Sequence, residues 1–126
     1  LMRNLFDKRM SELGLTRSQW WILNYLYFNE GINQSEFAKL LDLEKAPLSR
    51  LLDRMEKKGW IIRKSDKVDK RIKTVFLSKK IKPIIIKMRD KAQQTRQEAL
   101  SNLSYIEDQN LRHYLKRIKE TLVNKS

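Results

Sequence analysis

The chain has 126 residues and a net charge of +13; 40% of its residues are hydrophobic, 34% are charged, and it contains three Gly and two Pro. This length and composition suit a single, mostly helical domain and argue against disorder, and the absence of Cys excludes disulfides and thiolate metal sites within the chain. No apolar run approaches the roughly 20 residues that span a bilayer and no signal segment is recognised, so we expect a cytoplasmic protein with no membrane partner.

The first three predicted helices are marked by their ends. Apolar residues recur at helical spacing up to Gly14, where a helix can end. Thr16 and Gln19 form a capping-box pattern that opens a second helix, which continues to about Asn29. Asn33, with a Glu three residues later, repeats this start signal for a short third helix.

A fourth helix begins near Glu44 or Lys45, because Pro47 is tolerated only in a first helical turn. Its apolar positions follow the spacing of a core-facing stripe. These are Leu48, Leu51, Leu52 and Met55. The opposite face carries Lys45, Ala46, Ser49, Arg50, Asp53, Arg54 and Lys57. Gly59 suits the left-handed end of this helix.

Two short β-rich stretches follow, at residues 60–62 and 74–77. About eleven mostly polar residues join them, which predicts a hairpin whose charged tip cannot pack inward. From Glu44 to Lys91 the chain has 17 Lys and Arg against 6 Asp and Glu, a net of +11. A block this basic attracts polyphosphate, whereas a merely solubilising surface usually mixes the two signs.

Two amphipathic helices complete the chain. Ser78 can cap a helix running to about Asn102, roughly 37 Å long, with an apolar stripe from Ile81 to Ala99. A last helix carries a second stripe. Residues 20–77 can already close a core, so we expect a second copy of the chain to cover both stripes, the alternative being a monomer whose helices fold back. The predicted interface residues are Leu5, Ile85, Leu111, Leu115, Ile118 and Leu122.

The predicted fold class is therefore mainly α with a small β-hairpin wing. Residues 1–126 form one unit, in which 16–77 make a winged helix-turn-helix DNA-binding region. Residues 1–14 and 78–126 supply long dimerisation helices.

The run LLDRMEKKGWIIRKSDKVDKRIKTVFLS resembles the signature of the MarR (multiple antibiotic resistance regulator) family. The likeness includes the wing motif D-x-x-D-x-R at Asp66, Asp69 and Arg71. Two positions depart from the pattern: Ile81 stands where the family usually has Gly, and Pro47 where many members have Thr or Ser. The resemblance implies homodimers on pseudo-palindromic operators, with the fourth helix in the major groove and the wing in the minor groove. It also implies repression relieved by a small, often aromatic, effector.

In the predicted recognition helix, Arg50 is the candidate for base reading, since a guanidinium can donate two parallel bonds to guanine. Arg54 is expected at a phosphate, with a solvated ion pair as the alternative. The remaining candidates on this helix are Lys45, Ala46, Pro47 and Ser49. Gln34 and Ser35, at the start of the third helix, are expected near phosphate or act only as caps.

In the wing, Arg71 is expected to enter the minor groove, where narrow A·T tracts concentrate negative potential. Asp69 would orient Arg71, or is an ordinary turn residue. Phosphate contacts are expected from Lys64, Lys67, Lys70 and Lys73.

Trp20 and Tyr25 are candidates for an effector pocket, although an aromatic stripe at helical spacing is usually core. His113 is the sole histidine and, without Cys, builds no metal site. We find no catalytic set or phosphate-binding Gly loop, and expect neither an enzyme nor a cofactor. A winged helix used for protein interaction and a sequence-independent nucleic-acid-binding protein remain alternatives.

Overall fold

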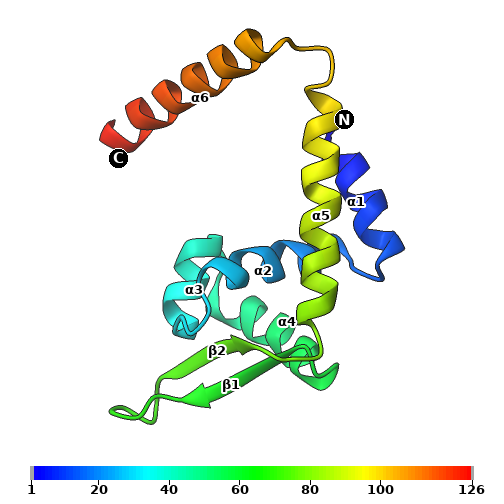
Figure 1. The fold of residues 1–126 in the computed structure, drawn as a ribbon. Helices are drawn as coiled ribbons and strands as arrows, with labels where there is room; N and C mark the ends of the chain where they lie inside the picture. The colour runs from blue at the N-terminus through cyan, green and yellow to red at the C-terminus, as the bar shows by residue number, and fades with distance from the viewer. Residues whose placement is uncertain (1, 126) are drawn as a thin grey trace.

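The computed structural model describes residues 2 to 125, and of residues 2 and 3 only the backbone (Figure 1). Leu1 and Ser126, at the outer ends of the predicted dimerisation segments, lie outside the described residues. The elements are α1 (Met2–Glu12), α2 (Arg17–Phe28), α3 (Gln34–Leu41), α4 (Lys45–Lys57), β1 (Ile61–Ser65), β2 (Lys73–Leu77), α5 (Lys82–Ala99) and α6 (Tyr105–Lys125). This order confirms a mainly helical fold with a two-stranded hairpin. Within residues 2 to 125, no helix has the length and apolar character needed to cross a membrane.

Local signals set the helix ends where the sequence predicts them. The Thr16 hydroxyl accepts from the Gln19 N–H at 3.3 Å, and the Gln19 side chain accepts from the Thr16 N–H at 2.9 Å, which completes the capping box. Asn33 accepts from the Glu36 N–H at 2.8 Å and caps α3. Gly59 follows α4 with φ +76°, the left-handed conformation expected there.

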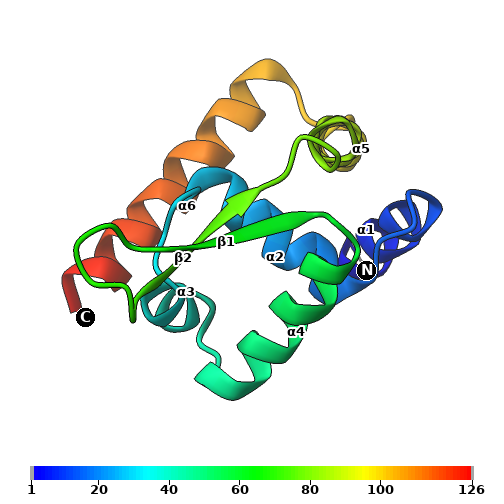
Figure 2. The same ribbon diagram turned by 90° about the horizontal axis from the view of Figure 1, so that it is seen from below.

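The hairpin is antiparallel and pairs Ile61 with Leu77 and Ser65 with Lys73. The two strands are longer than predicted, so the turn between them is residues 66–72. We call strands β1 and β2 with this turn the wing. Figure 2 shows the wing and α4 side by side on the face seen from below.

The short segment before α3 forms backbone hydrogen bonds with β2 of the wing. The Gly31 N–H donates to the Val75 carbonyl at 2.8 Å, and the Val75 N–H donates to the Ile32 carbonyl at 3.0 Å. Asn33 pairs with Thr74 in an isolated bridge. These bonds hold the first turn of α3 against β2.

A single hydrophobic core joins the predicted DNA-binding region to parts of the predicted dimerisation segments. It contains Met10, Leu15, Ile22, Leu23, Leu26, Phe37, Ala38, Leu41, Leu48, Leu52, Met55, Ile61, Val75, Leu77, Ile81, Ile85 and Met88. Leu51, the fourth residue of the α4 stripe, is half-buried against this core. The winged region is thus closed from above by α1 and α5.

The expectation that a second copy covers the stripe of α5 was wrong. Ile81, Ile85 and Met88 are at most 3% exposed within the chain itself, because α1 and α2 pack along this helix. Ile85 is therefore a core residue and cannot serve as an interface residue in this conformation.

The role predicted for Ser78 was also wrong. Its hydroxyl donates to the Gly59 carbonyl at 2.6 Å, so it fastens the end of the wing to the end of α4. Helix α5 begins later, at Lys82, without a side-chain cap and with Pro83 in its first turn. It ends at Ala99 and not near Asn102, and so is shorter than expected.

Helix α6 differs from the others because none of its residues is buried. Figure 1 shows it joined by a loop to the end of α5 and running above α2 and α3, apart from them. Leu115, Ile118 and Leu122 are 56%, 57% and 63% exposed, and Leu111 is half-buried. Leu5 on α1 is 37% exposed. The apolar face of α6 is thus left uncovered within the described chain.

Candidate nucleic-acid interface

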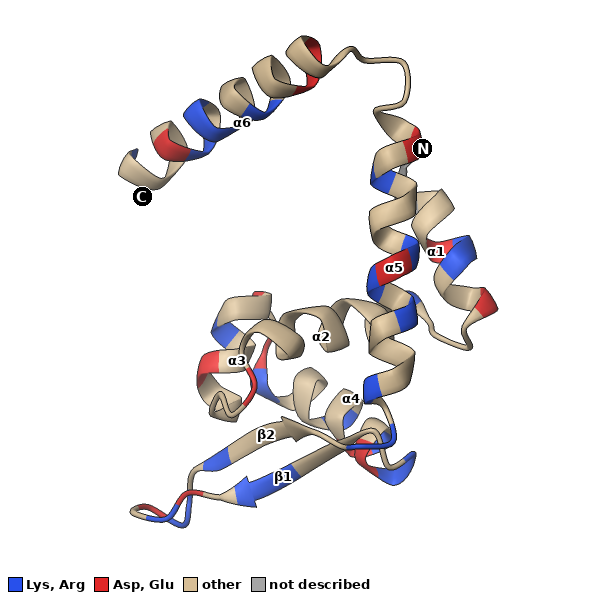
Figure 3. Ribbon diagram, in the orientation of Figure 1, with Lys and Arg blue, Asp and Glu red and all other residues tan. Residues whose placement is uncertain are grey.

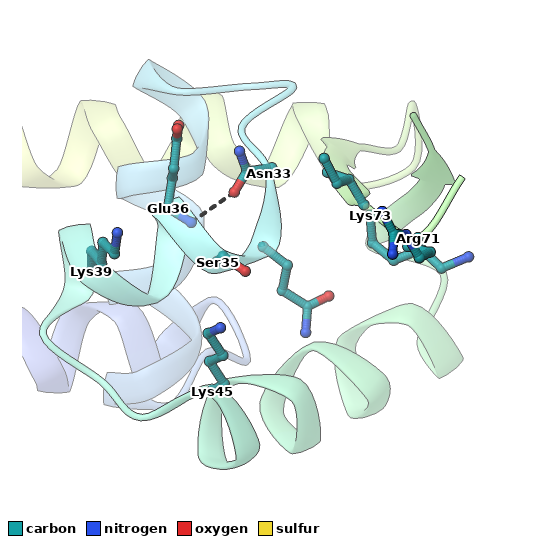
Figure 4. A pocket seen from close by; sticks show the side chains of 9 residues that line it. Asn33, Ser35, Glu36, Lys39, Lys45, Arg71 and Lys73 are labelled. Carbon is teal, nitrogen blue, oxygen red and sulfur yellow. Dashed lines mark hydrogen bonds between the residues drawn. The ribbon is translucent and has the colours of Figure 1, made fainter. Parts of the chain in front are cut away.

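A groove of about 470 Å³ brings the wing together with two helix segments that precede it in the chain (Figure 4). It lies between the start of α3, the start of α4 and the wing. Its lining residues are Asn33, Gln34, Ser35, Glu36, Lys39, Lys45, Arg71, Ile72 and Lys73. In Figure 4 the side chains of Ser35 and Lys45 lie on facing sides of this groove. Four of the lining residues are Lys or Arg against a single Glu, so the groove favours an anion.

The sequence correctly predicts which face of α4 is buried and which is exposed. Leu48, Leu52 and Met55 are buried, which leaves the opposite face toward solvent. Arg50 and Arg54 are exposed on that face. Of the other candidates, Lys45 and Ala46 are exposed, whereas Pro47 and Ser49 are half-buried.

Arg63 connects α4 to the wing, and sequence reasoning missed this role. Its guanidinium donates to Glu56 at 3.1 and 3.2 Å and also to Asp53, both on α4. These hydrogen bonds lower the pKa of Glu56 and raise that of Arg63. The alternation of a strand gave a signal, because it places Arg63 on the same face as the buried Ile61.

The turn of the wing is shaped by two aspartates. The Asp66 carboxylate accepts from the backbone N–H groups of Val68 and Asp69, each at 3.0 Å. The Asp69 carboxylate accepts from Nε and a terminal nitrogen of Arg71, each at 3.1 Å, and from the Arg71 backbone N–H at 3.0 Å. The bonds from Arg71 lower the pKa of Asp69. The Arg71 side chain is 90% exposed, so it is oriented by Asp69 while it remains free to reach a partner.

The four wing lysines are all exposed, but they differ in their contacts. Lys64 lies over the Phe76 ring at 4.9 Å from its centroid. Lys73 donates to the Ser65 hydroxyl at 2.8 Å and lines the groove. Lys67 and Lys70 belong to the turn itself.

A second, smaller cavity of about 120 Å³ lies between α1, α2 and α5. Its lining residues are Phe6, Met10, Trp20, Asn24, Met88, Arg89, Ala92 and Arg96. Trp20 thus faces the cavity, and Tyr25 does not line it, since Tyr25 packs edge-on against Trp21 at 6.0 Å. His113 is exposed on α6, and residues 2 to 125 contain no cluster of His, Asp and Glu that could hold a metal ion.

Comparisons with known proteins agree with this geometry. A family model described as the MarR family matches residues 13–72, which span α2, α3, α4, β1 and the turn of the wing. The crystal structure of wild-type MarR from E. coli, in its apo form, superposes with a TM-score of 0.82 at 29% identity and covers 93% of this chain and 87% of that one. Residues 13–72 of this chain thus match the MarR family model, and the fold as a whole is similar to that of MarR.

Other MarR-family structures extend the match. The transcriptional regulator SlyA is 29% identical with a TM-score of 0.79, and the match covers 98% of this chain and 87% of that one. A mutant of E. coli MarR, crystallised with operator DNA, is 29% identical with a TM-score of 0.76 over 93% of this chain and 84% of that one. The relatives that this chain resembles thus include a transcriptional regulator, SlyA, and a MarR protein that was crystallised with operator DNA.

Proposed function

We propose that the protein acts as a homodimeric, sequence-specific repressor on a pseudo-palindromic operator. In each half-site α4 enters the major groove and the wing enters the flanking minor groove. The groove between α3, α4 and the wing is the observation that carries this proposal, since it gathers cations from the predicted DNA-binding segments at one place. The operator complex of the E. coli relative supports it.

Within the half-site, Arg50 reads a base pair and Arg54 binds a phosphate. Both side chains are exposed on the face of α4 opposite the core, and neither needs the helix to unfold in order to reach DNA. Lys45, Ala46, Pro47 and Ser49 lie at the start of the same helix and complete the contact surface. Gln34 and Ser35 bind phosphate with the free N–H groups of the first turn of α3.

The wing supplies one specific contact and several general ones. Arg71, held by Asp69, enters a narrow minor groove. The exposed Lys64, Lys67, Lys70 and Lys73 bind phosphates and raise affinity for any duplex.

Dimerisation rests on α6, with help from Leu5 on α1. A helix with a continuous apolar face is stable in water only when that face is covered. Leu115 and Ile118 are 56% and 57% exposed, and the described residues bury none of the apolar face of α6, so a second copy of the chain covers it.

Relief of repression would depend on the cavity lined by Trp20. Its rings and the nearby Arg89 and Arg96 suit a small aromatic ligand that carries a negative charge. Benzoate is a suitable probe: quenching of tryptophan fluorescence that is lost in Trp20→Phe would support a site here, and unchanged quenching would place the ligand elsewhere.

Selection of bound sites from a random duplex pool tests the main proposal. We expect enrichment of two inverted half-sites at a fixed spacing, and weak competition from mixed-sequence DNA. Recovery of no preferred sequence would instead support sequence-independent binding. Recovery of single half-sites would contradict the dimer.

A further inference from the structure

A second basic surface lies outside the predicted DNA-binding residues. It consists of Lys57, Lys58, Lys79, Lys80 and Lys82, which we call the junction patch. All five are exposed, and they come from two segments, the end of α4 and the start of α5. Figure 3 shows Lys and Arg where these two helices meet, beside a stretch of Asp or Glu on α4, at the base of the wing and away from its turn.

Internal hydrogen bonds fix the two segments against each other. Besides the bond from the Ser78 hydroxyl to Gly59, the Ser78 N–H donates to the Trp60 carbonyl at 2.9 Å. The Lys80 ammonium donates to the Lys58 carbonyl at 3.0 Å, and Lys58 lies over the Trp60 ring at 4.9 Å. The patch is therefore held in place before any partner arrives.

The junction patch lacks neutralising acids. The nearest carboxylates along the chain, Asp53 and Glu56, are already bound to Arg63. Among residues 2 to 125, none of the five lysines takes part in an ion pair. The uncapped first turn of α5 adds the partial positive charge of its free N–H groups at the same place. Such an uncompensated positive surface suits a polyanion.

Its position relative to α4 suggests which polyanion. Lys45, the first residue of α4, lines the groove beside the wing, whereas Lys57 is the last residue of the same helix. The 13 residues of α4 extend about 20 Å, and the major groove of B-DNA is about 12 Å wide. A helix longer than the groove is wide can therefore meet the phosphate backbone at both ends.

We propose that the junction patch binds backbone phosphates of the same duplex, on the side of the major groove away from the wing. This inference rests on the proposed insertion of α4 into DNA. The patch would set affinity and salt dependence, and it would leave the choice of sequence to Arg50 and the wing.

The test removes three charges without disturbing the fixed lysines. The patch variant is Lys57→Gln/Lys79→Gln/Lys82→Gln, which spares Lys58 and Lys80. Its matched control, Lys87→Gln/Lys116→Gln/Arg117→Gln, removes the same charge from exposed positions on α5 and α6. Sedimentation first establishes that both variants keep the oligomeric state of the wild type.

Duplex affinity is then measured against salt concentration, on the selected operator and on a mixed-sequence duplex. The slope of log K against log salt should fall by about 0.9 for each phosphate that the variant no longer neutralises, and affinity at low salt by about tenfold or more on both duplexes. The control should change far less. Equal slopes for the patch variant and the control would overturn the inference.

Two further outcomes separate the possible failures. If the wild-type protein binds no duplex, the proposed function itself fails. If the patch variant keeps its slope for the first duplex but no longer binds a second duplex per dimer, then the patch contacts a different DNA segment, and the same-duplex inference is overturned.

Discussion

Helices α5 and α6 carry similar apolar stripes in sequence but have opposite surroundings. The stripe of α5 is covered by α1 and α2 of its own chain, and Ile85 is 1% exposed. The stripe of α6 is open to solvent, and Ile118 is 57% exposed. Helical spacing thus identifies which face of a helix is apolar, but it does not identify what covers that face.

The largest effect should come from a charge placed in the covered stripe. Ile85→Asp buries a carboxylate with no partner, so we expect a loss of at least about 3 kcal/mol in the free energy of unfolding, or failure to fold. Ile86→Asp is the matched control, because Ile86 is the next residue and is 60% exposed. Urea denaturation compares the two, and equal stability would mean that α5 does not pack on its own chain.

The open stripe should respond differently. Leu115→Asp/Ile118→Asp should leave the body folded but produce monomers in sedimentation, because the charges fall on the proposed interface. Operator affinity should fall by about a hundredfold or more, since two linked half-sites are no longer bound together. Glu120→Gln, on the polar face of α6, is the control. A wild-type chain that sediments as a monomer at micromolar concentration would contradict the proposed dimer.

Helix α4 also has a buried face and an exposed face, and the exposed face is the one proposed to contact DNA. Arg50→Ala changes an exposed side chain, so the free energy of unfolding should be retained. The variant should lose its preference at one base pair in each half-site, at a cost of about 1–3 kcal/mol in binding free energy per base pair read. Lys67→Ala should weaken all duplexes alike. If both variants lose equal affinity on operator and on mixed-sequence DNA, then Arg50 does not read bases.

The smallest effect is expected in the wing. Arg71→Ala should lower affinity most for sites flanked by A·T tracts, and Asp69→Asn should reproduce part of that loss although it removes a negative charge near DNA. A gain in affinity for Asp69→Asn would mean that the carboxylate only repels phosphate.

The direction of the Asp69 pKa shift adds a check by titration. The hydrogen bonds from Arg71 lower the pKa of Asp69 below its ordinary value of about 3.9, so the carboxylate is charged at any pH above that value. The pair with Arg71 is lost only when the pH falls through the lowered pKa of the folded protein. Preference for A·T flanks should therefore stay constant between about pH 5 and 8. A change of preference within this range would point to another group.

Features set by neighbouring residues could be predicted from the sequence. The capping box at Thr16, the cap at Asn33 and the end at Gly59 depend on a few adjacent positions, and all three were confirmed. Features set across the chain could not. Ser78 binds a carbonyl 19 residues away, and Arg63 joins two elements through carboxylates that a linear pattern does not pair with it.

The candidate site shows the same division. Composition located the positive charge, and the family resemblance supplied the order of the elements. The groove itself depends on the pairing of the segment at Gly31 with β2, which brings the start of α3 beside the wing. Neither helical periodicity nor charge predicts that pairing. The sequence alone therefore could not show that Lys45 and Arg71 line the same groove.

The packing of α1 on α5 has a consequence for the order in which the molecule can assemble. Arg9 donates to Thr95, 86 positions later, and to Glu98 at 2.6 Å. On the ribosome, α1 is synthesised before the winged region, whereas α5, the helix that covers it, follows that region. Contacts so distant along the chain slow folding, because a long loop must be closed before they form. Met10 and Met88 belong to the same core, so this core can be completed only after residue 88 has been synthesised.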